Sequence, residues 1–151
     1  MLDWHLTTIS LFITSLIALS YIDIKTGLLP DIITLPLLWL GLALSVFNMG
    51  LVDSKDAILG SICGYLVLWL VNYTYWLIRH TQGMGQGDFK LLAAIGAWLG
   101  WFPLTNILLF ASLAGICVAL LFKMLSNKPV PNSLPFGPFL AFGAICELTF
   151  I

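Results

Sequence analysis

Two aspartates border apolar segments that lie far apart in the chain. Asp23 ends the first apolar run, and Asp88 follows the glycine-rich stretch 83–87. Two carboxyl groups brought together can hydrolyse a peptide bond, because the ionised one takes a proton from water and the protonated one donates to the scissile carbonyl. Such a pair shares one proton, since two adjacent negative charges are unfavourable. Peptide hydrolysis by this pair therefore requires a fold that brings the two residues together.

Each aspartate also has a structural explanation. Asp23 can pair with Lys25, and Asp88 can cap the helix that follows it. Asp31 stands in the predicted first turn of a helix, where a carboxylate meets the positive end of the helix dipole. Whether Asp31 is such a cap or a contributor to a site stays open.

Glycines and a lysine surround Asp88. Gly83, Gly85 and Gly87 remove side chains and let another backbone approach closely, as an extended substrate requires. A flexible hinge without catalytic meaning is the alternative. Lys90 is expected to face a polar mouth near Asp88.

The composition places the chain in a membrane. It is 60% hydrophobic and 9% charged, whereas soluble proteins have roughly 45–50% and about 25%. A soluble domain of 151 residues has too little interior for so many apolar side chains. The first apolar run lacks a basic start and a cleavage site, so we expect a retained helix rather than a signal peptide. We expect residues 1–151 to form a single transmembrane domain.

Hydropathy predicts an all-α protein with about six transmembrane helices. Five segments meet the length of about 20 residues that a bilayer requires: 4–22, 28–47, 57–78, 104–125 and 134 to the C-terminus. The segment 88–101 is shorter and rises only about 21 Å at 1.5 Å per residue. A short helix that is entered by glycines and headed by an acid favours a functional site.

The cationic residues predict the orientation. With six crossings, one side carries Lys25, Arg79, Lys90, Lys123 and Lys128, and the other carries Lys55. The positive-inside rule makes the first side cytoplasmic and places both termini in the periplasm. Asp23 and Asp88 then lie at the same depth, which favours the paired interpretation.

The remaining acids and several glycines are expected to be structural. Water is expected to solvate four acids, Asp3, Asp53, Asp56 and Glu147. The pairs Gly60/Gly64 and Gly96/Gly100 have the spacing of closely packed helices.

No residue pattern predicts a metal ion or an organic cofactor. The three cysteines form no CxxC pair, and the two histidines are far apart in the chain. The glycine-rich stretch is not a P-loop, because no Gly-Lys-Ser/Thr follows it. The net charge is -1 and no basic stripe occurs, so we expect no nucleic-acid partner.

Four stretches resemble the type IV prepilin peptidase family. Residues 85–90 (Gly-Gln-Gly-Asp-Phe-Lys) resemble its GxGDxK motif, and residues 21–39 resemble the segment that holds its first catalytic aspartate. The run 90–100 is similar to the continuation of that motif, and 135–138 (Pro-Phe-Gly-Pro) resembles a late element of the family.

The resemblance implies a GxGD-type intramembrane aspartic endopeptidase. Its substrates would be the short basic leaders of type IV prepilins or type II secretion pseudopilins, cut at the cytoplasmic face of the bacterial inner membrane. Carried over by position, Asp23 and Asp88 are the catalytic pair, Gly85 and Gly87 shape the motif, and Lys90 is its basic member. Asp31 is a candidate supporting residue.

Longer family members carry an additional N-terminal part with two zinc-binding CxxC pairs, linked to N-methylation of the new pilin N-terminus. This chain begins about one helix before Asp23 and has no CxxC pair. We therefore expect neither zinc nor N-methyltransferase activity.

Two other interpretations stay open. Intramembrane acids also serve proton relays, so the chain can be a non-catalytic transport protein or an assembly factor for pili or secretion. It can also be a partner protein that has kept the fold and lost catalysis. Coupling to the proton motive force would favour the first, and binding of a leader without cleavage would favour the second.

Overall fold

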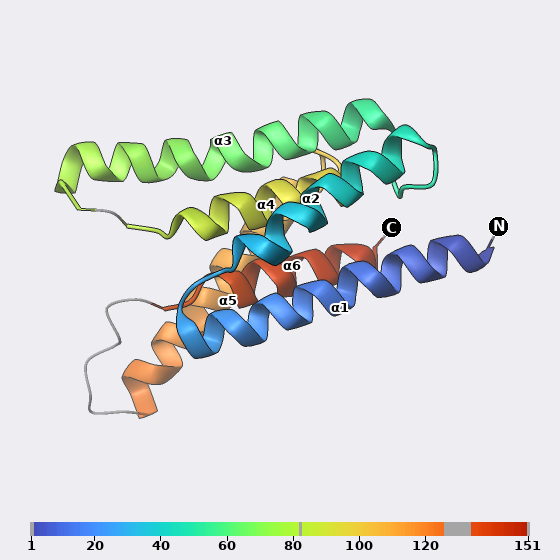
Figure 1. Ribbon diagram of the computed structural model, residues 1–151. Coiled ribbons are helices and arrows are strands. Elements are labelled where there is room, and N and C mark those ends of the chain that lie inside the picture. Colours follow the sequence, from blue (N-terminus) through green and yellow to red (C-terminus); the bar gives the residue numbers. More distant parts are fainter. Residues whose placement is uncertain (1, 82, 126–133, 151) are drawn as a thin grey trace.

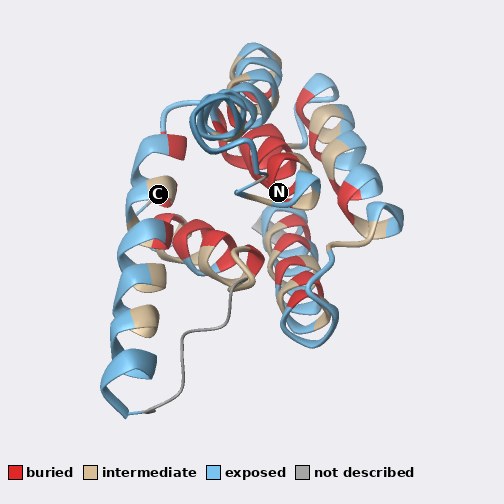
Figure 2. Ribbon diagram, turned by 90° about the vertical axis from the view of Figure 1, so that its left-hand side faces the viewer, coloured by how far each residue is buried: buried red, intermediate tan, exposed pale blue. Residues whose placement is uncertain are grey.

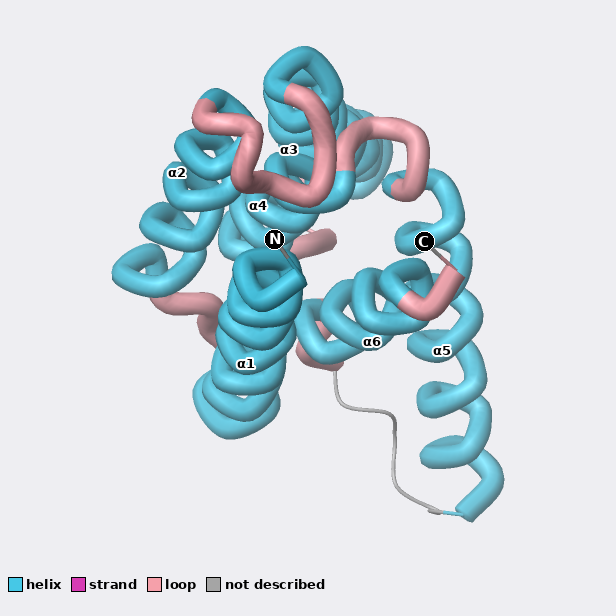
Figure 3. Tube along the Cα trace, turned by 90° about the vertical axis from the view of Figure 1, so that its right-hand side faces the viewer, coloured by secondary structure: helices cyan, strands magenta, loops and turns pink. Residues whose placement is uncertain are grey.

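The chain forms six α-helices in a computed structural model that describes residues 2–81, 83–125 and 134–150 (Figure 1). In chain order these are α1 (Leu2–Thr26), α2 (Asp31–Val46), α3 (Ser54–Arg79), α4 (Gln86–Leu99), α5 (Leu104–Leu125) and α6 (Gly137–Leu148). No strand occurs in these residues (Figure 3). The predicted all-α fold with six helices is confirmed.

Within the described residues, three helices are long and apolar enough to cross a membrane: α3, α5 and the part Trp4–Thr26 of α1. Helices α2 and α6 are apolar but have only 16 and 12 residues. Their predicted starts at 28 and 134 were wrong. In both cases an X-Pro step, at Pro30 and at Pro135, disfavours the helical conformation of the preceding residue, so the helix begins later.

Helix α4 lies in the middle of the molecule, between α3 on one side and α1 and α6 on the other (Figure 1). Eleven of its 14 residues are buried, and it forms much of the buried interior in Figure 2. Because protein surrounds it, this short helix need not reach across the lipid by itself.

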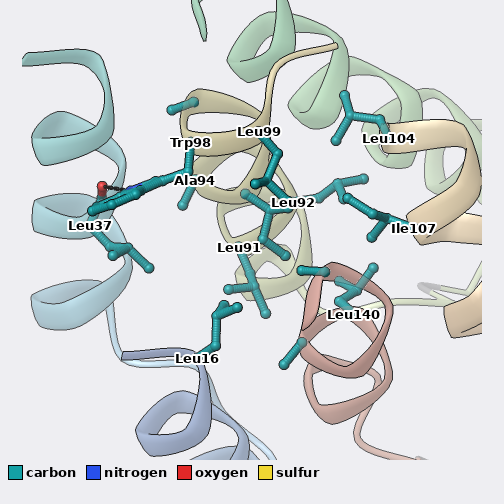
Figure 4. Close-up of a cluster of buried hydrophobic side chains, with 14 of the residues drawn as sticks. Leu16, Leu37, Leu91, Leu92, Ala94, Trp98, Leu99, Leu104, Ile107 and Leu140 are labelled. Carbon is teal, nitrogen blue, oxygen red and sulfur yellow. Dashed lines mark hydrogen bonds between the residues drawn. The ribbon is translucent and has the colours of Figure 1, made fainter. Parts of the chain in front are cut away.

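The apolar core forms around α4, and Figure 4 shows leucines from α1, α4 and α6 meeting there. Trp98 of α4 stacks on Phe12 of α1, with ring centroids 4.9 Å apart. Its indole Nε1–H donates to the carbonyl oxygen of Leu37 in α2 at 2.8 Å. One side chain therefore ties three helices together.

Glycines bring α3 and α4 into backbone contact. A methyl group added at Gly60 would collide with the carbonyl oxygen of Gly96, and one added at Gly96 would collide with that of Gly60. At Gly64 the added carbon would lie 2.6 Å from the carbonyl oxygen of Leu92. The close packing predicted from the spacing is confirmed at these positions, whereas Gly100 ends α4 with a φ of 85°.

The helices alternate in direction, so the two ends of the molecule differ. The ends marked N and C lie at the same end in Figures 1 and 3. The loop 27–30, the segment after α3 and the start of α6 gather at the opposite end. This alternation agrees with the predicted order of crossings. Lys128 and the side chain of Asp3, which entered the sequence predictions, lie outside the described residues.

The prediction that Glu147 is solvated was wrong. Its side chain is buried, and its Oε1 accepts a hydrogen bond from Asn106 Nδ2 of α5 at 3.2 Å. Helix α6 packs against α5 and α1, and this hydrogen bond joins its last turn to α5. A position close to the C-terminus is therefore still inside the protein.

Candidate active site

Asp23 lies inside α1, which continues to Thr26. The expectation that Asp23 ends its helix was therefore wrong by one turn. Its side chain is 4% exposed, and its Oδ2 accepts a hydrogen bond from the backbone N–H of Gly137 at 3.0 Å. The alternative pairing with Lys25 is not found among the described residues, because Lys25 Nζ lies over the ring of Tyr21 at 4.6 Å.

Asp88 is the third residue of α4, and Gly85 takes the cap position. The alternative in which Asp88 caps the helix is therefore wrong. Its side chain is buried, with 8% exposed. The glycines at 85 and 87 carry no side chain, so the local sequence leaves the carboxyl group accessible from the cavity that these residues line.

Both aspartates line one cavity of about 650 Å³ at the end of the molecule opposite the termini. The walls come from the loop 27–29, the glycine-rich stretch 83–87 and residues 134–136 before α6. The structure thus brings together the two residues that the sequence paired.

The three glycines before Asp88 all line this cavity, but they differ in their surroundings. A carbon added at Gly83 would lie 2.7 Å from the ring of Tyr75, and one at Gly87 would lie 2.8 Å from Cβ of Leu29. At Gly85 the nearest atom would be Oδ2 of Asp88, at 3.8 Å. Gly85 therefore leaves open space directly beside the carboxyl group.

Asn72 of α3 holds this stretch in place, and the sequence analysis missed it. Its Oδ1 accepts hydrogen bonds from the backbone N–H groups of Gly83 and Met84, both at 3.1 Å. The signal was available, since Asn72 is an isolated amide in an otherwise apolar helix, and such a polar group requires a partner.

Asp31 and Lys90 form an ion pair at the cavity. Lys90 Nζ lies 2.8 and 2.7 Å from the two carboxylate oxygens of Asp31. The side chain of Asp31 is 53% exposed and that of Lys90 is 27% exposed, so the pair lies at the mouth of the cavity. Lys90 is near the mouth as expected, but its ammonium group is bound to Asp31.

Gly137 is the second functional residue that the sequence analysis missed. It belongs to the Pro-Phe-Gly-Pro stretch, which had been noted only as a resemblance. Its contact with Asp23 joins residues 114 positions apart. No spacing rule predicts such a contact.

Among the residues that the structure describes, no group of three or more His, Cys, Asp or Glu side chains could hold a metal ion.

Comparison with known proteins identifies the family. The sequence model of the type IV leader peptidase family matches residues 10–120, a range that holds both aspartates. The chain belongs to the type IV leader peptidase family. It is thus a multi-pass membrane protein of an intramembrane aspartic peptidase family, and the resemblance inferred from its motifs is confirmed.

Several curated relatives are prepilin leader peptidase/N-methyltransferases. The protein from Escherichia coli K12 is 49% identical over 143 residues, covering 93% of this chain and 62% of the relative. That of Burkholderia pseudomallei 1026b is 45% identical over 136 residues, covering 90% and 44%. That of Aeromonas hydrophila is 48% identical over 126 residues, covering 83% and 43%. The chain thus spans from 43% to 62% of the length of these three relatives. No solved structure is significantly similar to it.

Proposed function

We propose that this protein is an aspartic endopeptidase that removes the leader peptides of type IV prepilins or type II secretion pseudopilins. The observation that carries the proposal is that Asp23 and Asp88 line the same cavity. The names of the relatives supply the substrate class.

The buried pair of carboxyl groups suits peptide hydrolysis. With one proton shared between them, one carboxylate accepts a proton from water while the other carboxyl group donates to the carbonyl oxygen. The two side chains are almost entirely shielded from bulk solvent, which strengthens each electrostatic interaction with a bound peptide. This chemistry needs no cofactor.

The cavity suits an extended peptide. Its volume of about 650 Å³ lies in the range of small-ligand sites, about 300–1,000 Å³, so it holds a few residues around the scissile bond. Gly85 leaves room for the substrate backbone beside Asp88. Asp31 also lies at the rim, where its carboxylate is paired with Lys90.

We further propose that the cavity faces the cytoplasm and that the protein lies in the bacterial inner membrane with both termini in the periplasm. Lys25, Arg79 and Lys90 belong to the cavity end of their helices, whereas Lys55 belongs to the start of α3. An excess of cations marks the cytoplasmic side. Reporter fusions after Lys25 and after Lys55 test this, and cytoplasmic reporter activity at position 55 would contradict it.

The absence of zinc and of N-methyltransferase activity stays a prediction, as does the single-domain organisation of residues 1–151. Membrane lipid is the proposed surrounding of the outer helix faces, which expose many large apolar side chains.

Co-expression with a prepilin that carries a basic leader tests the function. We expect the precursor band on a gel to convert to the mature band with the wild type, and to persist with Asp23→Asn or Asp88→Asn. Asp53→Asn is the matched control, because Asp53 is an exposed aspartate at the other end of the molecule. Cleavage that persists in either cavity variant would overturn the aspartic mechanism. A precursor that binds the wild type and is never cut would favour the partner protein without catalysis.

A further inference from the structure

The two aspartates differ in their hydrogen bonding to the start of α6. The backbone N–H of Gly137 donates to Oδ2 of Asp23 at 3.0 Å, and both residues are buried. Gly137 is the first residue of α6, so its N–H has no partner within the helix. A hydrogen bond that a carboxylate accepts favours its charged form, and such charge-assisted bonds are stronger than neutral ones.

The helix dipole alone does not distinguish the two residues. Asp88 stands in the first turn of α4, where the positive helix end also favours a negative charge. The two residues differ in the hydrogen bond that a backbone N–H donates directly to the carboxyl group. Within residues 2–81, 83–125 and 134–150, Gly137 supplies the one backbone N–H that hydrogen-bonds to either carboxyl group.

Glycine is required at this position for a steric reason. A Cβ at position 137 would lie 2.6 Å from Oδ2 of Asp23 and 3.4 Å from Cδ1 of Leu29. The carboxyl group would have to turn away from the N–H to make room. The contact therefore depends on the missing side chain as much as on the donor.

We infer that Gly137 is a positioning residue that keeps Asp23 ionised, so that Asp23 is the base of the pair and Asp88 is its protonated acid. The inference rests on the proposed peptidase function and adds to it which carboxyl group carries the shared proton.

With Asp23 as the base and Asp88 as the acid, every proton that moves during hydrolysis has a donor and an acceptor. Asp23 takes a proton from water as the water oxygen bonds to the carbonyl carbon, and Asp88 gives its proton to the carbonyl oxygen. When the tetrahedral intermediate collapses, the C–N bond breaks and Asp23 returns its proton to the leaving amine. Asp88 regains a proton from a hydroxyl group of the intermediate, so the pair ends as it began.

The charged groups around Asp23 do not compete with this contact. From the helices that line the cavity come Asp88 and Lys90 of α4 and Asp31 of α2. Lys90 is bound to Asp31, and Lys25 on α1 itself lies over Tyr21. In the described part of α6 the charged side chain is Glu147, at the far end of that helix.

The test compares Gly137→Ala with Gly143→Ala. Both add one methyl group to α6, and both place it 2.6 Å from an oxygen atom, but at Gly143 that atom is the carbonyl oxygen of Ile107. Loss of the Gly137 donor makes the Asp23 anion less favourable. We therefore expect the acid limb of the cleavage rate against pH to move upward by about one pH unit in Gly137→Ala. In Gly143→Ala it stays where the wild type has it.

An ester bond at position 137, with glycolic acid in place of glycine, removes the N–H and adds no carbon atom. This second variant is expected to show the same upward shift even if Gly137→Ala folds poorly. Equal acid limbs in the wild type and the ester variant would overturn the inference.

Infrared titration of the purified protein separates this inference from the proposed function, because it needs no substrate. Subtracting the spectrum of Asp23→Asn isolates the conversion of the pair from carboxylate to carboxylic acid. We expect the ester variant to take up its second proton about one pH unit higher than the wild type. A shift in a protein that cleaves no prepilin would sink the proposed function and support the role of Gly137. Cleavage of a prepilin without a shift in the ester variant would support the proposed function and overturn the role of Gly137.

Discussion

At its C-terminal end α4 meets α3 backbone to backbone, whereas at its N-terminal end the same helix opens into the cavity. Both ends depend on glycine. Gly96 leaves no space, because an added methyl group would strike the backbone of Gly60. Gly85 leaves space, because an added methyl group would meet only Asp88 Oδ2 at ordinary contact distance. One end fixes the helix in the fold, and the other leaves the buried carboxyl group of Asp88 accessible from the cavity.

A glycine in a membrane helix therefore has two separate uses. Between helices, small residues allow the close packing that replaces the hydrophobic effect inside a bilayer. Before a buried acid, they clear the approach of another backbone. Substitutions at the two ends should therefore separate stability from activity.

The largest effect on stability is expected from Gly96→Ala. Helix α3 must move away from α4, and overpacking of this kind costs typically 1–3 kcal/mol; we expect about 3 kcal/mol because the obstacle is backbone. Thermal unfolding in detergent measures it. Gly115→Ala is the control, since its added carbon would lie 3.7 Å from the Phe139 ring, an ordinary contact. Equal melting temperatures of the two variants would contradict the close approach of α3 and α4.

A smaller effect, on activity, is expected from the ion pair at the rim. Because Lys90 and Asp31 are partly exposed, breaking the pair should cost only about 0.5 kcal/mol of stability. We expect Lys90→Met to lower cleavage by about tenfold, a barrier increase of about 1.4 kcal/mol, and thus far less than loss of either Asp23 or Asp88.

The comparison of Lys90→Met, Asp31→Asn and the double variant shows whether the pair acts as a unit. If it does, the double variant loses no more activity than the worse single variant. A loss in Lys90→Met equal to that in Asp88→Asn would overturn this ranking and give Lys90 a direct part in the chemistry.

The smallest effect on stability is expected from Gly85→Ala. The backbone at Gly85 has a φ of -70°, which any residue adopts, and the added methyl group meets open space. We expect the melting temperature to stay within the change that about 0.5 kcal/mol causes, while cleavage falls because the methyl group stands in the path of the substrate. Unchanged cleavage by Gly85→Ala would show that the substrate does not pass there.

Local patterns explain most of what the sequence predicted. Apolar length predicted the six helices, and glycine spacing predicted that the helices carrying Gly60 and Gly96 pack closely. The short segment 88–101, entered by glycines and headed by an acid, indicated a functional site. The pairing of Asp23 with Asp88 followed from membrane depth, because two helix ends on one side of a bilayer are confined to the same layer.

The features that sequence reasoning missed depend on contacts between distant segments. The Gly137 donor, the burial of Glu147 and the binding of Lys90 by Asp31 all depend on how the helices are rotated and how closely they approach. No pattern within one helix carries that information. The late starts of α2 and α6 were local, by contrast, and could have been read from Pro30 and Pro135.

The central claim is that Asp23 and Asp88 act as one catalytic unit. Its most direct test is the cleavage rate of a leader-bearing prepilin by the purified protein, measured for the wild type, Asp23→Asn, Asp88→Asn and the double variant, each shown to be folded. Residues that act as a unit lose function non-additively. We predict that either single change reduces the rate to the same residual level as the double change. A single variant that still cleaves well above that level would contradict the account.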